Sequence, residues 1–102
     1  MLVFEFNTKI AGSQYYFDSI KIEPKDQLEL ELEPTNKFDP NAIKILFQKK
    51  IVGYVPKEIS ILIKSKIDDD IFMIAECTGW KSQFEILIKI MGHQTRVNKN
   101  FP

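Results

Sequence analysis

The sequence predicts a mainly β fold: an OB-like or SH3-like small antiparallel β-barrel of about six strands with one amphipathic helix. Three observations lead to this fold class. Several segments alternate between apolar and polar residues, the connections between them are short and turn-like, and only one stretch has helical spacing. A small sheet that curls closed, with a helix at one opening, would cover the strand edges of so short a chain.

The first predicted strand begins at the N-terminus. Leu2, Phe4 and Phe6 fall on one side of an extended chain, and more polar residues fall on the other. We expect this strand to continue to Ile10 and to bend at residues 11–13, where a glycine permits a backbone geometry that other residues resist.

Three further strands follow in the first half of the chain. Leucine and glutamate alternate along residues 28–33, as expected for an antiparallel sheet with one solvated face. Residues 34–41 form a loop rich in proline, asparagine and aspartate. Residues 42–47 and 51–55 then form a hairpin with a polar turn at residues 48–50. The residues expected to point inward from the first strand of this hairpin are Ile43, Ile45 and Phe47.

The single predicted helix follows the hairpin. Pro56 suits the first helical position, and Ile59, Leu62, Ile63 and Ile67 recur at helical spacing. About three turns are expected.

The last two predicted strands cover residues 71–77 and 83–91, joined by residues 78–82. In the second of these strands one face is apolar. The residues expected on this face are Phe84, Ile86, Ile88 and Ile90.

Length and composition predict a single domain over residues 1–102. The chain is 44% apolar, which is enough for one core but not for two. The core is expected within residues 3–91, and the polar tail, residues 92–102, is expected to be frayed.

Charge and cysteine content limit the possible partners and compartments. Fourteen basic and fourteen acidic side chains cancel, so any contact with nucleic acid must be local. Cys77 is the only cysteine, which suits a reducing cytoplasm. The N-terminus does not resemble a signal peptide and no apolar stretch is long enough to span a membrane. We therefore expect a soluble cytoplasmic protein with no membrane partner.

The sequence carries no enzyme signature. It has no phosphate-binding glycine loop, no metal-ligand spacing and no nucleophile elbow. Cys77 and His93 could form a thiol–imidazole pair, but nothing in the sequence supports one. We expect no catalytic residue, no metal site and no cofactor.

Two aromatic positions stand out as candidate binding residues. Phe38 lies in a polar loop, where its ring either covers the core or forms a platform for a ligand. Asp39 and Asn41 could form an Asx turn that merely starts the next strand. Tyr15 and Tyr16 lie on a segment expected to be extended, so they would point to opposite sides and one of them should be exposed.

Three segments closely resemble the HIRAN domain family: residues 12–16, 30–45 and 51–57. The central signature is an asparagine, aromatic, aspartate, spacer, Asn-Ala-Ile string over residues 36–43, followed by Gly-Tyr-Val-Pro at residues 53–56. The resemblance implies an OB-like β-barrel with a helix. In that family the helicase versions, which handle stalled replication forks, bind the 3′ end of single-stranded DNA, and stand-alone bacterial members also occur.

The resemblance also implies a set of site residues. Tyr15 and Phe38 would stack on the terminal base, Asp39 would accept a hydrogen bond from the terminal hydroxyl group, and Lys57 would contact a phosphate. The other members of the implied nucleic-acid-binding set are Gln14, Asn36 and Tyr54.

The chain departs from the helicase versions at three of these positions. Gln14 stands where they carry a phosphate-contacting arginine, Phe38 replaces a tyrosine and Tyr54 replaces a histidine. Since a lost cation weakens contact with the DNA backbone, we expect micromolar-class binding at best, drawn from Lys57. The other candidate cations are Lys44 and Lys37.

The leading hypothesis is therefore a non-catalytic module that weakly binds a single-stranded DNA end, alone or beside a helicase, in DNA repair. The alternative is a protein–protein interaction domain that uses the same aromatic patch, with the glutamate row of residues 28–33 setting the charge of the contact. The oligomeric state stays open.

Overall fold

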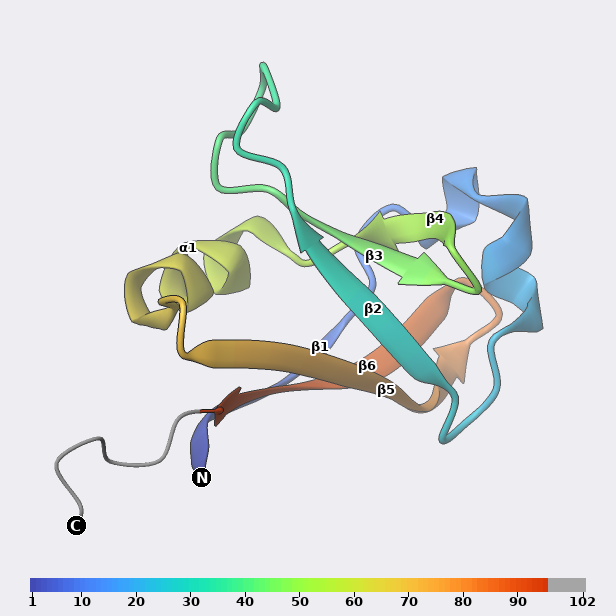
Figure 1. The fold of residues 1–102 in the computed structure, drawn as a ribbon. Helices are drawn as coiled ribbons and strands as arrows, with labels where there is room; N and C mark the ends of the chain where they lie inside the picture. Colours follow the sequence, from blue (N-terminus) through green and yellow to red (C-terminus); the bar gives the residue numbers. More distant parts are fainter. Residues whose placement is uncertain (96–102) are drawn as a thin grey trace, which may run out of the picture.

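Six antiparallel strands form one curved sheet in the computed structural model, which describes residues 1–95 (Figure 1). In chain order the elements are β1 (Leu2–Lys9), η1 (Ser13–Tyr15), η2 (Phe17–Lys21), β2 (Gln27–Leu32), β3 (Ile43–Phe47), β4 (Lys50–Tyr54), α1 (Lys57–Lys66), β5 (Ile71–Ser82) and β6 (Glu85–Gln94), with η denoting 3-10 helices. The strands lie in the order β1-β6-β5-β2-β3-β4. The predicted class, mainly β with six antiparallel strands and one α-helix, is confirmed.

The sheet stops short of the closed barrel that the sequence suggests. Its edge strands, β1 and β4, meet only just beyond the end of β1, where Ala11 forms a single bridge with Tyr54. The Ala11 N–H donates to the Tyr54 carbonyl oxygen over 2.7 Å, and the Tyr54 N–H donates to the Ala11 carbonyl oxygen over 2.9 Å. Gly12 follows with a left-handed φ of 74° and η1 begins, so the chain turns away before further rungs can form.

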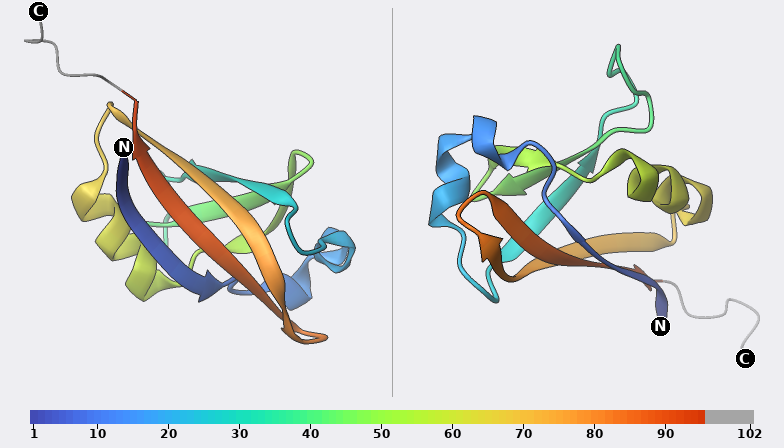
Figure 2. Two further views of the ribbon diagram at one scale, coloured as in Figure 1. Left: turned by 90° about the horizontal axis from the view of Figure 1, so that it is seen from below. Right: turned by 180° about the vertical axis from the view of Figure 1, so that it is seen from behind.

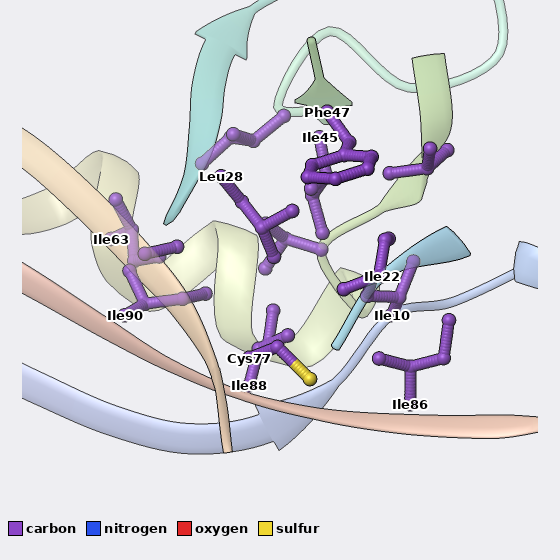
Figure 3. Packing of buried hydrophobic residues seen from close by; sticks show 14 of the residues in the cluster. Ile10, Ile22, Leu28, Ile45, Phe47, Ile63, Cys77, Ile86, Ile88 and Ile90 are labelled. Carbon is purple, nitrogen blue, oxygen red and sulfur yellow. The ribbon is translucent and has the colours of Figure 1, made fainter. Parts of the chain in front are cut away.

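The alternating segments place their apolar residues in one core. Leu28 is buried, and Leu30 and Leu32 pack against the same cluster, as the leucine–glutamate alternation predicts. Ile43 and Ile45 of β3 are fully buried. Figure 3 shows side chains from both halves of the chain pointing into this cluster.

The β3–β4 hairpin turns through two residues. Gln48 and Lys49 both have positive φ angles, 51° and 69°, which a two-residue turn of type I′ requires. The turn is therefore one residue shorter than predicted, because Lys50 already pairs with Phe47.

Helix α1 covers one opening of the curved sheet (Figures 1 and 2). Ile63 is fully buried and Ile59 packs against the core, but Leu62 remains 46% exposed, contrary to the prediction. Pro56 precedes the helix instead of starting it, so the first helical residue is Lys57. No helix within residues 1–95 is long and apolar enough to cross a membrane.

Strand β5 is longer than predicted, so the turn that follows it begins later in the chain. It runs through the predicted connection to Ser82, which pairs with Glu85, so the turn consists of Gln83 and Phe84 alone. Phe84 is consequently outside the ladder and 65% exposed, although the sequence placed it on the apolar face. The other three residues predicted on that face are buried: Ile86, Ile88 and Ile90.

Strand β6 also extends into the segment expected to be frayed. Gly92 pairs with Phe4 and His93 pairs with Leu2, and the strand ends at Gln94. Residues 96–102 of that predicted tail lie outside the described residues.

The segment between β1 and β2 is helical, not extended. Residues 13–15 and 17–21 form two short 3-10 helices, with Tyr16 extended between them. The Ser19 hydroxyl group ties them together by donating to the carbonyl oxygens of Ser13 (2.9 Å) and Tyr16 (2.7 Å). Tyr15 is nevertheless exposed and Tyr16 half-buried, so one of the two adjacent tyrosines is exposed as predicted.

The close approach of β4 to Ala11 depends on Gly53, and this dependence can be tested. A Cβ atom at Gly53 would overlap Ile10 and lie 2.7 Å from the Ala11 carbonyl oxygen. The backbone of Gly53 also has a positive φ of 148°, which other residues rarely adopt. We expect Gly53→Ala to lower the free energy of unfolding by about 3 kcal/mol, as measured by urea denaturation. Gly79→Ala is the matched control, because Gly79 has a similar φ of 152° but no atom within 4 Å of the added Cβ. Equal losses in the two variants would contradict the close approach.

Candidate functional site

A groove of about 430 Å³ lies between the β2–β3 loop, the end of β4 and the start of α1. In Figure 1 this loop projects away from the body of the fold, above β3 and α1. The groove is lined by Ala11, Asn36, Phe38, Asp39, Ala42, Tyr54, Val55 and Lys57. Five of the seven predicted site residues therefore line one hollow: Asn36, Phe38, Asp39, Tyr54 and Lys57.

The loop is shaped by the side chain of Asn36. Its Oδ1 accepts hydrogen bonds from the N–H groups of Phe38 (2.9 Å) and Asp39 (3.0 Å), as in an Asx turn. The Asp39 carbonyl oxygen in turn accepts from the Ala42 N–H over 3.0 Å, next to the start of β3. The loop is thus held by its own polar groups, and the Phe38 side chain is left 95% exposed.

Glu33 connects this loop to β4. Its Oε1 accepts one hydrogen bond from Asn36 Nδ2 and one from the Tyr54 hydroxyl group, both over 3.0 Å. The hydrogen bond from Asn36 is the main influence that lowers the pKa of Glu33 below its usual value, and burial opposes it. Sequence reasoning missed Glu33, because it counted this residue only as part of a solvated glutamate row.

Lys44 does not serve as the free cation that the sequence suggested. Its Nζ lies 3.5 Å from Glu31 Oε1 and 3.7 Å from Glu33 Oε2, and its side chain is only 20% exposed. Glu31 and Lys44 are directly opposite in the β2–β3 register, so the lysine is engaged by the glutamate row and is not a free cation.

Asp39 uses one of its carboxylate oxygens within the loop. Oδ1 accepts from the Asn41 N–H over 2.9 Å, so the Asx turn considered from the sequence is present. Within residues 1–95, no group donates to Oδ2. Asp39 is half-buried and lines the groove, so it combines a structural contact with an open acceptor.

Tyr15 does not line the groove; it lies on η1, four residues after Ala11 of the groove wall. Its side chain is 80% exposed, and its Cδ2 is 3.7 Å from the position that a Cβ atom on Gly12 would take. The bridge between Ala11 and Tyr54 attaches this segment to the groove wall. The structure thus leaves both predicted rings uncovered, Tyr15 on η1 and Phe38 on the loop, without direct ring contact between them.

Gln14 faces a second, smaller hollow of about 210 Å³. This hollow is lined by Ser13, Gln14, Tyr16, Ser19, Ile20, Trp80, Gln83 and Phe84. Phe84 is an exposed ring that sequence reasoning missed, because the position of the β5–β6 turn depends on a strand register that alternation alone does not reveal.

Lys57 is the cation of the groove. It is exposed, and within residues 1–95 no carboxylate oxygen lies within 4.0 Å of its Nζ. It is also the first residue of α1, at the positive end of the helix dipole. The groove therefore combines an exposed ring, an open carboxylate oxygen and a cation.

A larger hollow of about 520 Å³ lies along β1 and β6, and three of its four charged lining residues are engaged with one another. Glu85 contacts Lys9 and Lys81, each over 3.8 Å, and no aromatic ring lines the hollow. Within the described part of the chain, no cluster of three or more histidine, cysteine or acidic side chains could hold a metal ion. Cys77 is buried in the core, where burial raises the pKa of its thiol.

Comparisons with known proteins agree on the family and the fold. The profile of the HIRAN domain family matches residues 3–98. The crystal structure of the HIRAN domain of human HLTF superposes with a TM-score of 0.68 at 18% identity, covering 89% of this chain and 76% of that one. A crystal structure of a protein from Lactobacillus plantarum gives a TM-score of 0.58 at 16% identity, covering 88% and 100%. No curated protein matches the chain significantly.

The contact between Tyr54 and Glu33 predicts a loss of stability at alkaline pH. Burial, followed by the hydrogen bond to Glu33, raises the pKa of Tyr54 from 10.0 to about 12. Since the folded state favours the neutral phenol, this contribution to stability is complete below pH 10.0 and is lost as the pH rises through about 12. In urea denaturation across this window, Tyr54→Phe should lose less stability than the wild type. Tyr15→Phe, which alters an exposed phenol, should follow the wild type, and identical slopes in all three proteins would contradict the contact.

Proposed function

The chain belongs to the HIRAN domain family, and from this we propose that it is a non-catalytic binding module for the free 3′ end of single-stranded DNA. The observation that carries the proposal is the uncovered ring of Phe38, held 95% exposed at a groove that also contains a carboxylate and a lysine. A solvent-exposed aromatic ring on a loop fixed by hydrogen bonds can stack on a flat ligand.

The two exposed rings would hold the terminal base. Phe38 lines the groove, and Tyr15 lies on η1, which the Ala11–Tyr54 bridge attaches to the groove wall. Stacking on an aromatic side chain contributes about 1–3 kcal/mol per base and tolerates any base, because every base has a π-face. The module would therefore recognise an unpaired end without reading its sequence.

Asp39 would distinguish the end from a continuing strand. Its Oδ2, which accepts no hydrogen bond within residues 1–95, can accept one from a terminal 3′ hydroxyl group. A phosphate in the same place would bring two negative charges together, which is unfavourable in a half-enclosed groove.

Lys57 would contact the first backbone phosphate, supported by the amides at the start of α1. With Gln14 uncharged and Lys44 engaged by glutamates, only one or two phosphates would be neutralised. The affinity should then be in the micromolar class, with a slope of log K against log salt of about −1.

The second hollow supplies a place for a further base. Its exposed ring, Phe84, shares the hollow with Gln14, the residue before Tyr15. A strand whose last base stacks near Tyr15 could continue over Gln14 to Phe84, so we include Phe84 in the proposed interface.

The first test compares two forms of one short oligonucleotide. Fluorescence anisotropy should give a dissociation constant about tenfold lower for the 3′-hydroxyl form than for the 3′-phosphate form, since a hydrogen bond to a carboxylate is replaced by charge repulsion. Asp39→Asn should reduce this preference. Equal affinity for both forms would remove the 3′-end proposal. No binding of either form would also remove it and would favour a protein ligand for the same aromatic patch.

The second test removes the rings one at a time. Phe38→Ala should weaken binding about tenfold, and Phe84→Ala should have a smaller effect that grows with the length of the oligonucleotide. Phe72→Ala is the matched control, because Phe72 is 47% exposed on β5, where it stacks on His93 and not at the groove. If all three variants bind as the wild type does, the rings do not form the interface.

A further inference from the structure

We infer that Glu33 is the positioning residue of the groove: it holds the β2–β3 loop in its ligand-ready shape by joining Asn36 to Tyr54. The inference deepens the proposed function and rests on it for the ligand. It assigns a role to a residue that does not line the groove and that the sequence placed in a solvated row.

The contacts place Glu33 at the base of the loop. One oxygen, Oε1, accepts from Asn36 Nδ2 and from the Tyr54 hydroxyl group, and the other, Oε2, lies 3.7 Å from Lys44 Nζ. The backbone adds to this, because the Glu33 N–H donates to the Ala42 carbonyl oxygen (2.9 Å) and the Glu33 carbonyl oxygen accepts from the Asn36 N–H (3.0 Å). Glu33 thus contacts both ends of the loop, the neighbouring strand and a compensating cation.

Asn36 transmits this contact to the binding residues. With its Nδ2 held by Glu33, its Oδ1 is oriented to accept the N–H groups of Phe38 and Asp39. The Asn36 amide therefore positions both Phe38 and Asp39, which would meet the ligand. The Glu33 carboxylate in turn positions the Asn36 amide. Tyr54, at the opposite wall of the groove, is held by the same oxygen.

The charge of Glu33 strengthens both hydrogen bonds, since bonds to an ionised acceptor are stronger than neutral ones. Glu33 is ionised at neutral pH, its lowered pKa extends the ionised range further into acid, and Lys44 compensates its charge. A loop ordered in this way before the ligand arrives loses less conformational freedom on binding.

Glu31 provides the matched control. It lies on β2, two residues before Glu33, and also contacts Lys44, but its side chain is 59% exposed and within residues 1–95 it makes no side-chain hydrogen bond to the loop. Removing either carboxylate takes one negative charge from beside Lys44, and only Glu33 holds the loop.

The first experiment measures the loop without any ligand. In Glu33→Ala, amide hydrogen exchange at Phe38 and Asp39 should become about tenfold faster than in Glu31→Ala, and the tyrosinate absorbance change assigned to Tyr54 should move to lower pH. Glu33→Gln, which keeps an acceptor oxygen, should lie between them and guards against a variant that fails to fold. Unchanged exchange and an unchanged Tyr54 transition in both Glu33 variants would overturn the inference.

The second experiment measures binding of a short 3′-hydroxyl oligonucleotide by the same proteins. Glu33→Ala should weaken binding about tenfold, Glu33→Gln less, and Glu31→Ala less than about twofold. Binding by Glu33→Ala that equals binding by Glu31→Ala would overturn the positioning role. If the wild type binds no oligonucleotide, the proposed function fails, and the exchange experiment still decides whether Glu33 holds the loop.

Discussion

The two hydrogen bonds between Ala11 and Tyr54 hold the parts of the groove together. The groove uses residues from the end of the first strand, the β2–β3 loop and the β4–α1 junction, which are far apart in the chain. Gly53 allows the close approach, since its neighbours leave no room for a side chain. The bridge places η1, with Tyr15, beside the wall that carries Tyr54 and leads directly to Lys57.

Much of the fold follows from alternation in the sequence, because burial on one face of a strand leaves a period of two. The isoleucines of β3 and β6 and Leu28 of β2 are buried where this period predicts, and the other two leucines of β2 pack against the same core. The 3-10 helices of residues 13–21 could not be predicted in this way, since they depend on hydroxyl-to-carbonyl bonds from Ser19 and carry no hydrophobic period. The sequence also could not predict how far the sheet closes into a barrel, because this depends on where the chain turns away after Ala11.

In the candidate site, too, the features set by local sequence were predictable and those set by pairing between strands were not. Five of the residues that the family signature implied line one groove, because their order along the loop and the β4–α1 junction is local information. The roles of Lys44 and Glu33 depend on the pairing of β2 with β3 and on the distance from the loop to Tyr54, which are not local. Phe84 was misplaced for a related reason: the turn that exposes it is set by the register of β5 on β6. Pairing across strands, and not composition, decides which charges and rings are available.

The most direct test of the account is a map of the surface that a single-stranded DNA end contacts. In a titration of the labelled protein with a short 3′-hydroxyl oligonucleotide, followed by NMR of the backbone amides, the largest shift changes should fall on residues 36–39, 54–57 and 14–15. Shift changes confined to the outer face of β1, β6 and β5, or no shift changes at saturating oligonucleotide, would contradict the account.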